Sequence, residues 1–267
     1  MNVLMLGRQL PVSGRSAQAT REHRFARFLA QGHRLTLAFV TDEPDPFGAL
    51  SSLRAQFTDI EFAVVPRAWK SLSGAVRLAT GGSCTMTYYH SEALTARLAD
   101  RMRAERYDLV YISSSGMIRY ALDTEPSVPL VMDFGDVDSE WWLSEAAGRS
   151  FPGARFCRTE SLRLRAAEAA VARRAARCVV SSEQAARVLA SFAPWAPATV
   201  IPDGVDPGSA AAPPGAAAGP TWEAVQAQLA RVLAAVVAAP VPAAPRRQPV
   251  GHLEPRPGRA PVTAGGR

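Results

Sequence analysis

The chain has 267 residues, of which 48% are hydrophobic and 20% charged, and its formal net charge is +6 at pH 7. That composition is ordinary for a soluble globular protein. Six Arg and two Glu in residues 207–267 supply +4 of the charge, so residues 1–206 lack the basic face that nucleic-acid binding requires. Cys84, Cys157 and Cys178 are far apart and form no CxxC pair, which excludes a disulfide framework and a zinc site and predicts no metal.

The N-terminal stretch "MNVLMLG" has too short an apolar part for a signal peptide and no basic residues before it. Elsewhere no run approaches the roughly 18 apolar residues of a membrane span. We therefore expect a cytoplasmic protein, with peripheral contact at the cytoplasmic membrane as an alternative.

Short apolar runs rich in β-branched residues predict seven strands, at 2–6, 34–40, 60–65, 108–113, 129–134, 177–181 and 198–202. Their uninterrupted apolar character favours a parallel sheet that is covered on both faces. Between them, amphipathic stretches predict helices at 16–32, 91–107, 159–176 and 181–193. This alternation predicts an α/β fold over residues 1–206: a Rossmann-like, doubly wound, mostly parallel sheet of about seven strands.

The pattern changes after Asp206. Of the 61 residues in 207–267, 35 are Ala, Pro or Gly, which predicts a low-complexity and largely disordered tail. Only residues 221–239 have helical periodicity, with an apolar side made of Trp222, Val225, Leu229, Val232, Leu233 and Val236.

Ligands of open α/β sheets bind beyond the carboxyl ends of the strands. The first such loop, residues 7–21, contains Gly14 and leads into a helix whose N-terminus favours anions. It has neither the G-x-G-x-x-G nor the P-loop spacing, so a dinucleotide site is not indicated. An anion site and a flexible connection with a turn glycine both remain open.

The loop after the fifth predicted strand, "DFGDVDSEWW" at 133–142, holds four acidic residues in eight. One interpretation is a helix N-terminus capped by Asp138 or Ser139. Capping explains Asp133 and Asp136 less well because both precede the helix. We favour a substrate role for at least one of these two carboxylates.

Two further segments have mainly structural interpretations. "SSSGM" at 113–117 includes Ser114, which could bind a polyol, although Ser/Gly turns are common. The Arg-rich helix at 158–177 is interleaved with Glu160 and Glu168 and predicts a solvated face. Attraction of this helix to anionic lipid headgroups is the alternative.

Several segments, taken in order, resemble the N-terminal half of GT-B glycosyltransferases of the family 4 type. They are "GHRLTLAFV", "YYHSEALTARLADRMRAERYDLVYISSSGMIRYAL", "VPLVMDFGDVDSEWW", the helix with Glu168 that leads into "ARCVVSSEQAARVL", and "VIPDGVD". The resemblance spans about residues 1–206 and is closest to hexose transferases of bacterial exopolysaccharide synthesis. It implies an acceptor-binding Rossmann-like domain that faces a nucleotide-sugar-binding domain across the catalytic cleft.

The resemblance also suggests roles for individual residues. Arg21 stands where these transferases often have an Arg, and "DFGD" stands where many have His-Asp, with Gly135 in the His place. It implies Asp136 and Asp133 as catalytic candidates. The acceptor-binding candidates are Gly14, Arg21, Ser114 and Asp138.

We expect no cofactor; the nucleotide-sugar is the donor substrate. The expected partner is a sugar or a lipid-linked saccharide acceptor. The Glu-x7-Glu motif and the basic residues of a donor domain are missing from residues 207–267. Arg, Ala, Gly and Pro have GC-rich codons, so a shifted reading frame in GC-rich DNA would encode such a segment. We therefore expect a truncated or frameshifted tail. Without a donor domain, we expect the chain to be inactive alone.

Two alternatives remain. One is a non-catalytic domain completed by a separate donor-domain chain. The other is a different nucleotide-dependent Rossmann-like enzyme, such as an epimerase, against which the missing glycine fingerprint counts.

Overall fold

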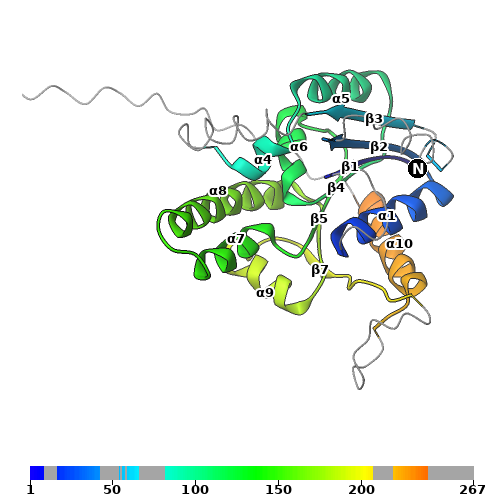
Figure 1. Ribbon diagram of the computed structural model, residues 1–267. Helices are drawn as coiled ribbons and strands as arrows, with labels where there is room; N and C mark the ends of the chain where they lie inside the picture. Colours follow the sequence, from blue (N-terminus) through cyan, green and yellow to red (C-terminus); the bar gives the residue numbers. More distant parts are fainter. Residues whose placement is uncertain are drawn as a thin grey trace, which may run out of the picture.

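The computed structural model describes residues 1–8, 17–42, 54, 56–57, 59–65, 82–206 and 219–239. Seven strands form one sheet in the order β3-β2-β1-β4-β5-β6-β7, and every neighbouring pair is parallel. The strands are β1 (Asn2–Gly7), β2 (Arg34–Thr41), β3 (Asp59–Val64), β4 (Leu109–Ser113), β5 (Leu130–Gly135), β6 (Arg177–Val180) and β7 (Ala198–Val200) (Figure 1). The doubly wound parallel sheet predicted from the sequence is confirmed.

All five predicted helices are present, as α1 (Ala17–Gly32), α5 (Glu92–Ala104), α8 (Gly153–Arg174), α9 (Glu183–Phe192) and α10 (Trp222–Ala238). Ser91 and Ser182 cap α5 and α9 by accepting backbone N–H groups, at 3.4 Å and 3.1 Å. The sequence did not predict the shorter elements α4 (Cys84–Tyr88), η1 (Ser115–Met117) and α6 (Ile118–Thr124) as helices. The remaining helix, α7 (Asp138–Ala147), begins where the sequence offered a helix start as one of two interpretations.

The two faces of the sheet bury separate apolar clusters because side chains alternate along each strand. In β4, Val110 and Ile112 pack with residues of α5, α6, α8 and α9. Leu109 and Tyr111 of the same strand point to the other face, where α1 and α10 cover them. Among the helices of the described ranges, none is long and apolar enough to cross a bilayer.

Helix α10 belongs to the core of the sheet although it follows the predicted domain boundary. The helix lies beside α1 (Figure 1), and its apolar side is buried in the cluster that α1 shares. Trp222 is edge-on to Phe25, with 6.3 Å between the ring centroids. The Gln228 side chain donates a hydrogen bond to the Val200 carbonyl at 2.8 Å. Helix α10 therefore shares one apolar cluster with the first 206 residues. Division of the chain into domains at residue 206 stays a prediction.

The strand order reverses between β1 and β4, which lie side by side at the centre of the sheet. Chain segments that leave the carboxyl ends of β1, β4 and β5 therefore diverge at one edge. Arg8, Ser114 and Asp136 are the first residues after these strands. This edge is where the fold places a ligand site.

Candidate functional site

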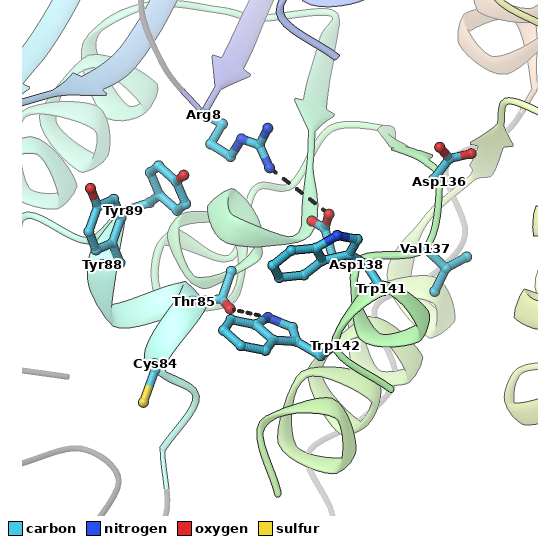
Figure 2. Close-up of a pocket in the computed structure, with 10 residues that line it drawn as sticks. All are labelled: Arg8, Cys84, Thr85, Tyr88, Tyr89, Asp136, Val137, Asp138, Trp141 and Trp142. Carbon is cyan, nitrogen blue, oxygen red and sulfur yellow. Dashed lines mark hydrogen bonds and ion pairs between the residues drawn. The ribbon is translucent and has the colours of Figure 1, made fainter. Parts of the chain in front are cut away.

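A pocket of about 570 Å³ opens at this edge (Figure 2). Its aromatic lining comes from α7, from α4 and from the residue after α4, and its polar lining comes from the ends of β1 and β5, from α4 and from the first residue of α7. The aromatic residues are Tyr88, Tyr89, Trp141 and Trp142, and the charged ones are Arg8, Asp136 and Asp138. Such a mixture of aromatic walls and a few polar groups is typical of small-molecule sites.

Helix α4 is held in place by a buried carboxylate of α8. Glu160 accepts hydrogen bonds from the Ser83 hydroxyl at 2.6 Å and from the backbone N–H groups of Cys84 and Thr85, both at 2.8 Å. The indole N–H of Trp142 then donates to the Thr85 hydroxyl at 2.9 Å (Figure 2). The prediction of a solvated Glu160 is wrong, because this fully buried residue compensates its desolvation with three donors.

Asp138 is the carboxylate that the fold orients most firmly in the pocket. One oxygen, Oδ2, accepts from the Ser115 N–H at 3.1 Å and from the Ser114 hydroxyl at 3.2 Å. The other, Oδ1, lies 4.0 Å from an Arg8 guanidinium nitrogen, and 24% of the side chain is exposed. Burial raises the pKa of Asp138, and Arg8 and the two serines oppose this shift.

The start of α7 differs from the expected capping. Val137 is the N-cap and makes no side-chain cap bond, so neither Asp138 nor Ser139 caps the helix. Instead Glu168, far along the chain on α8, accepts the Ser139 N–H at 3.1 Å and the Ser115 hydroxyl at 2.8 Å. Glu168 is fully buried rather than solvated, which corrects the interpretation of the Arg-rich helix.

Arg21 and Asp133 lie together, away from the pocket lining. The Arg21 Nε donates to Asp133 at 3.0 Å, and the Tyr111 hydroxyl donates to the same carboxylate at 2.6 Å. Arg21 also reaches the Ile201 carbonyl at 3.0 Å and Asp203 at 2.8 Å. With exposures of 1% and 0%, Arg21 and Asp133 connect α1, β5 and the segment after β7. Their contact with an acceptor stays a prediction.

The remaining predicted site residues fall into three positions. Asp136 is exposed, lines the pocket and accepts a hydrogen bond from the Ser181 hydroxyl. The Ser114 hydroxyl donates a hydrogen bond to Asp138. The backbone φ of Ser114 is 82°, a positive value that is rare for a residue other than glycine. Gly14 lies outside the described residues.

Sequence reasoning missed six residues as parts of the site: Arg8, Tyr88, Tyr89, Trp141, Trp142 and Glu168. Arg8 carries a usable signal, because it is the first residue beyond β1. A Cβ on Gly116 would lie 2.6 Å from the Tyr89 ring, so a glycine is needed for this ring to approach η1. That requirement becomes visible only when the two segments meet in space.

The family model for Glycosyltransferase Family 4 matches residues 18–209 of the chain. Among solved structures, sucrose-phosphate synthase from Thermosynechococcus elongatus is 12% identical with a TM-score of 0.45, covering 89% of this chain and 100% of that one. Anabaena HepE in complex with UDP and glucose is 17% identical with a TM-score of 0.44, and covers 76% of this chain and 45% of its own.

A UDP-glucosyltransferase from Polygonum tinctorium is 13% identical with a TM-score of 0.42, over 77% of this chain and 53% of its own. The chain thus spans about half the length of HepE and of the Polygonum enzyme. The search of curated protein sequences found no match.

Proposed function

Because this chain belongs to glycosyltransferase family 4, we propose that it supplies the acceptor-binding domain of a GT-B-type sugar transferase. The observation that carries the proposal is the pocket at the carboxyl edge of the sheet, with Asp138 held in it by Ser114 and Ser115. This edge, beside the point where strand order reverses, is the usual ligand position in open α/β sheets.

The lining suits a saccharide. Trp141 and the Tyr88–Tyr89 pair offer aromatic faces for the apolar side of a pyranose ring. Asp138 and Asp136 offer carboxylate oxygens that accept hydrogen bonds from sugar hydroxyls. We therefore assign acceptor binding chiefly to Asp138, with Asp136 as a second hydroxyl acceptor.

We propose a polysaccharide or lipid-linked saccharide of exopolysaccharide synthesis as the acceptor, a nucleotide-sugar as the donor, and the cytoplasm as the location. The resemblance of residues 1–206 to exopolysaccharide transferases supports this narrower assignment.

The chain alone is proposed to bind acceptor without transferring sugar. Departure of a nucleoside diphosphate requires donors or cations aimed at the developing negative charge. Over the described ranges, the pocket lining has one basic residue, Arg8, which lies beside Asp138 and over the Tyr89 ring. The diphosphate contacts are therefore assigned to a donor domain, which a partner chain could provide.

Replacing Asp138 with Asn should weaken saccharide binding by about tenfold or more, since a hydrogen bond to a charged group contributes about 1.5–3 kcal/mol. Saturation-transfer NMR with a panel of mono- and oligosaccharides would measure the saccharide affinity of both proteins. The matched control is Asp100→Asn, because this exposed carboxylate of α5 pairs with the exposed Arg103 on the same helix. Equal loss in both variants would exclude the assigned site, and no binding by the wild type would exclude an acceptor domain.

We also propose that the connection between α7 and α8 contacts an anionic membrane surface. Phe151 in this connection is 77% exposed, and Leu162 on α8 is 68% exposed. Arg155, Arg158 and Leu162 share one helix face by their spacing of three and four residues, and both arginines are exposed. Exposed apolar groups beside basic ones suit a lipid headgroup region.

The double change Arg155→Gln and Arg158→Gln should lower binding to vesicles containing phosphatidylglycerol by more than tenfold, at about 1 kcal/mol for each arginine. Co-sedimentation at low salt measures this. Arg187→Gln on α9 serves as the control for loss of positive charge elsewhere on the surface. Unchanged sedimentation of the double variant, or equal binding to neutral vesicles, would contradict the contact.

A further inference from the structure

Glu168 lies directly behind the pocket and has no role in the acceptor contacts assigned above. Its Oε1 atom accepts from both the Ser115 hydroxyl and the Ser139 N–H, which belong to η1 and α7. Among the residues that the structure describes, its buried Oε2 atom has no hydrogen-bond partner, and neither does the Ser139 hydroxyl. A fully buried carboxylate with an unused oxygen is costly, which calls for an explanation.

Both partners of Glu168 are next to Asp138. Ser139 follows Asp138 in the chain, and the N–H of Ser115 donates to the Asp138 carboxylate at 3.1 Å. Ser114, which also donates to Asp138, has a positive φ of 82° that the surrounding contacts must maintain. Glu168 thus holds the two segments that orient Asp138, one on each side of it.

We propose that Glu168 is a positioning residue for Asp138: by holding Ser115 and Ser139, it orients the Asp138 carboxylate toward the pocket and couples its own charge to that carboxylate. The link to acceptor binding rests on the proposed function, whereas the coupling of the two carboxylates does not.

The electrostatics agree with this geometry. Burial, with a contribution from the negative charge of Asp138, raises the pKa of Glu168 to about 7. Because the charge of Asp138 acts on Glu168, the pair resists carrying two negative charges. Arg8 favours ionised Asp138, and Arg8 itself interacts with Glu22 and Tyr89.

Two backbone amides report separately on the two carboxylates in a ¹⁵N–¹H NMR titration of the whole chain. The Ser139 N–H follows Glu168, and the Ser115 N–H follows Asp138. In the wild type we expect the Ser139 shift to titrate near pH 7. In Glu168→Gln, which keeps an accepting oxygen, that step disappears. In Asp138→Asn the Ser139 midpoint moves to lower pH, because the negative charge that Asp138 carries near pH 7 is gone.

The matched control is Glu140→Gln, which removes a carboxylate in the first turn of α7 that pairs with Arg165 on α8. It should leave the Ser139 midpoint unchanged. A Ser139 midpoint that is the same in wild type and Asp138→Asn overturns the proposal. If Asp138→Asn gives no folded spectrum, Glu168→Gln decides instead: the Ser139 step near pH 7 must disappear, and a step that persists overturns the coupling.

A second arm tests the consequence for the pocket, with the saccharide that binds best in the panel as probe. Wild-type affinity should change between pH 6 and 8 as Glu168 ionises, and the Glu168→Gln affinity should stay level. If the amides behave as expected while no saccharide binds, the proposed function fails and the coupling stands. If a saccharide binds with equal pH dependence in both proteins, positioning of the acceptor by Glu168 is overturned.

Discussion

Replacing Asp133 with Asn should lower the free energy of unfolding by about 3–5 kcal/mol, the cost of removing one partner from a buried ion pair. Asp133 is fully buried and accepts from Arg21, from the Tyr111 hydroxyl at 2.6 Å and from the Gly135 N–H at 3.0 Å. Arg21 is itself 1% exposed and, among the described residues, would keep Asp203 as its charged partner. Urea unfolding monitored by circular dichroism measures the loss.

Asp203→Asn is the matched control for this prediction. Asp203 pairs with the same guanidinium but is 43% exposed, so water replaces much of its contribution and we expect about 0–1 kcal/mol. Equal losses of unfolding free energy in the two variants would show that burial does not determine how much the Arg21–Asp133 pair stabilises the fold. Saccharide binding by the folded fraction of Asp133→Asn separates a structural role from acceptor contact, since a purely structural residue leaves that affinity unchanged.

Replacing Leu233 with Ala should destabilise the fold by about 2–5 kcal/mol through the lost burial and the cavity that remains. Leu233 is fully buried in the cluster that α10 forms with α1 and with the sheet. The control is Leu162→Ala, because the Leu162 side chain is 68% exposed and its truncation should change stability by less than about 0.5 kcal/mol. Differential scanning calorimetry of both variants gives the comparison.

Comparable stability of the two leucine variants would mean that α10 does not contribute to the core. The expected difference has a structural origin. Leu109, Tyr111 and Val179 point from the central strands to the face that α10 covers, and without the helix they would form an exposed apolar patch.

The sequence alone determined the sheet and most of its helices. Each strand lies in a short, mainly apolar run, so its position can be found without knowing its neighbours. Seven such runs alternating with amphipathic stretches specify a doubly wound parallel sheet. Local capping residues such as Ser91 and Ser182 mark helix starts because their partners lie three residues away. The family resemblance likewise depends on segment order, which the family match over residues 18–209 confirms.

Only the tertiary structure decided which charged residues face the interior. Glu160 and Glu168 look like parts of a solvated helix face because their donors, at Ser83–Thr85, Ser115 and Ser139, lie 29 to 77 positions away in the chain. Asp133, a catalytic candidate from the resemblance, lies in a buried ion pair with Arg21, 112 residues earlier in the chain, and its catalytic role stays a prediction. A buried charge requires partners, and periodicity says nothing about partners that only folding brings together.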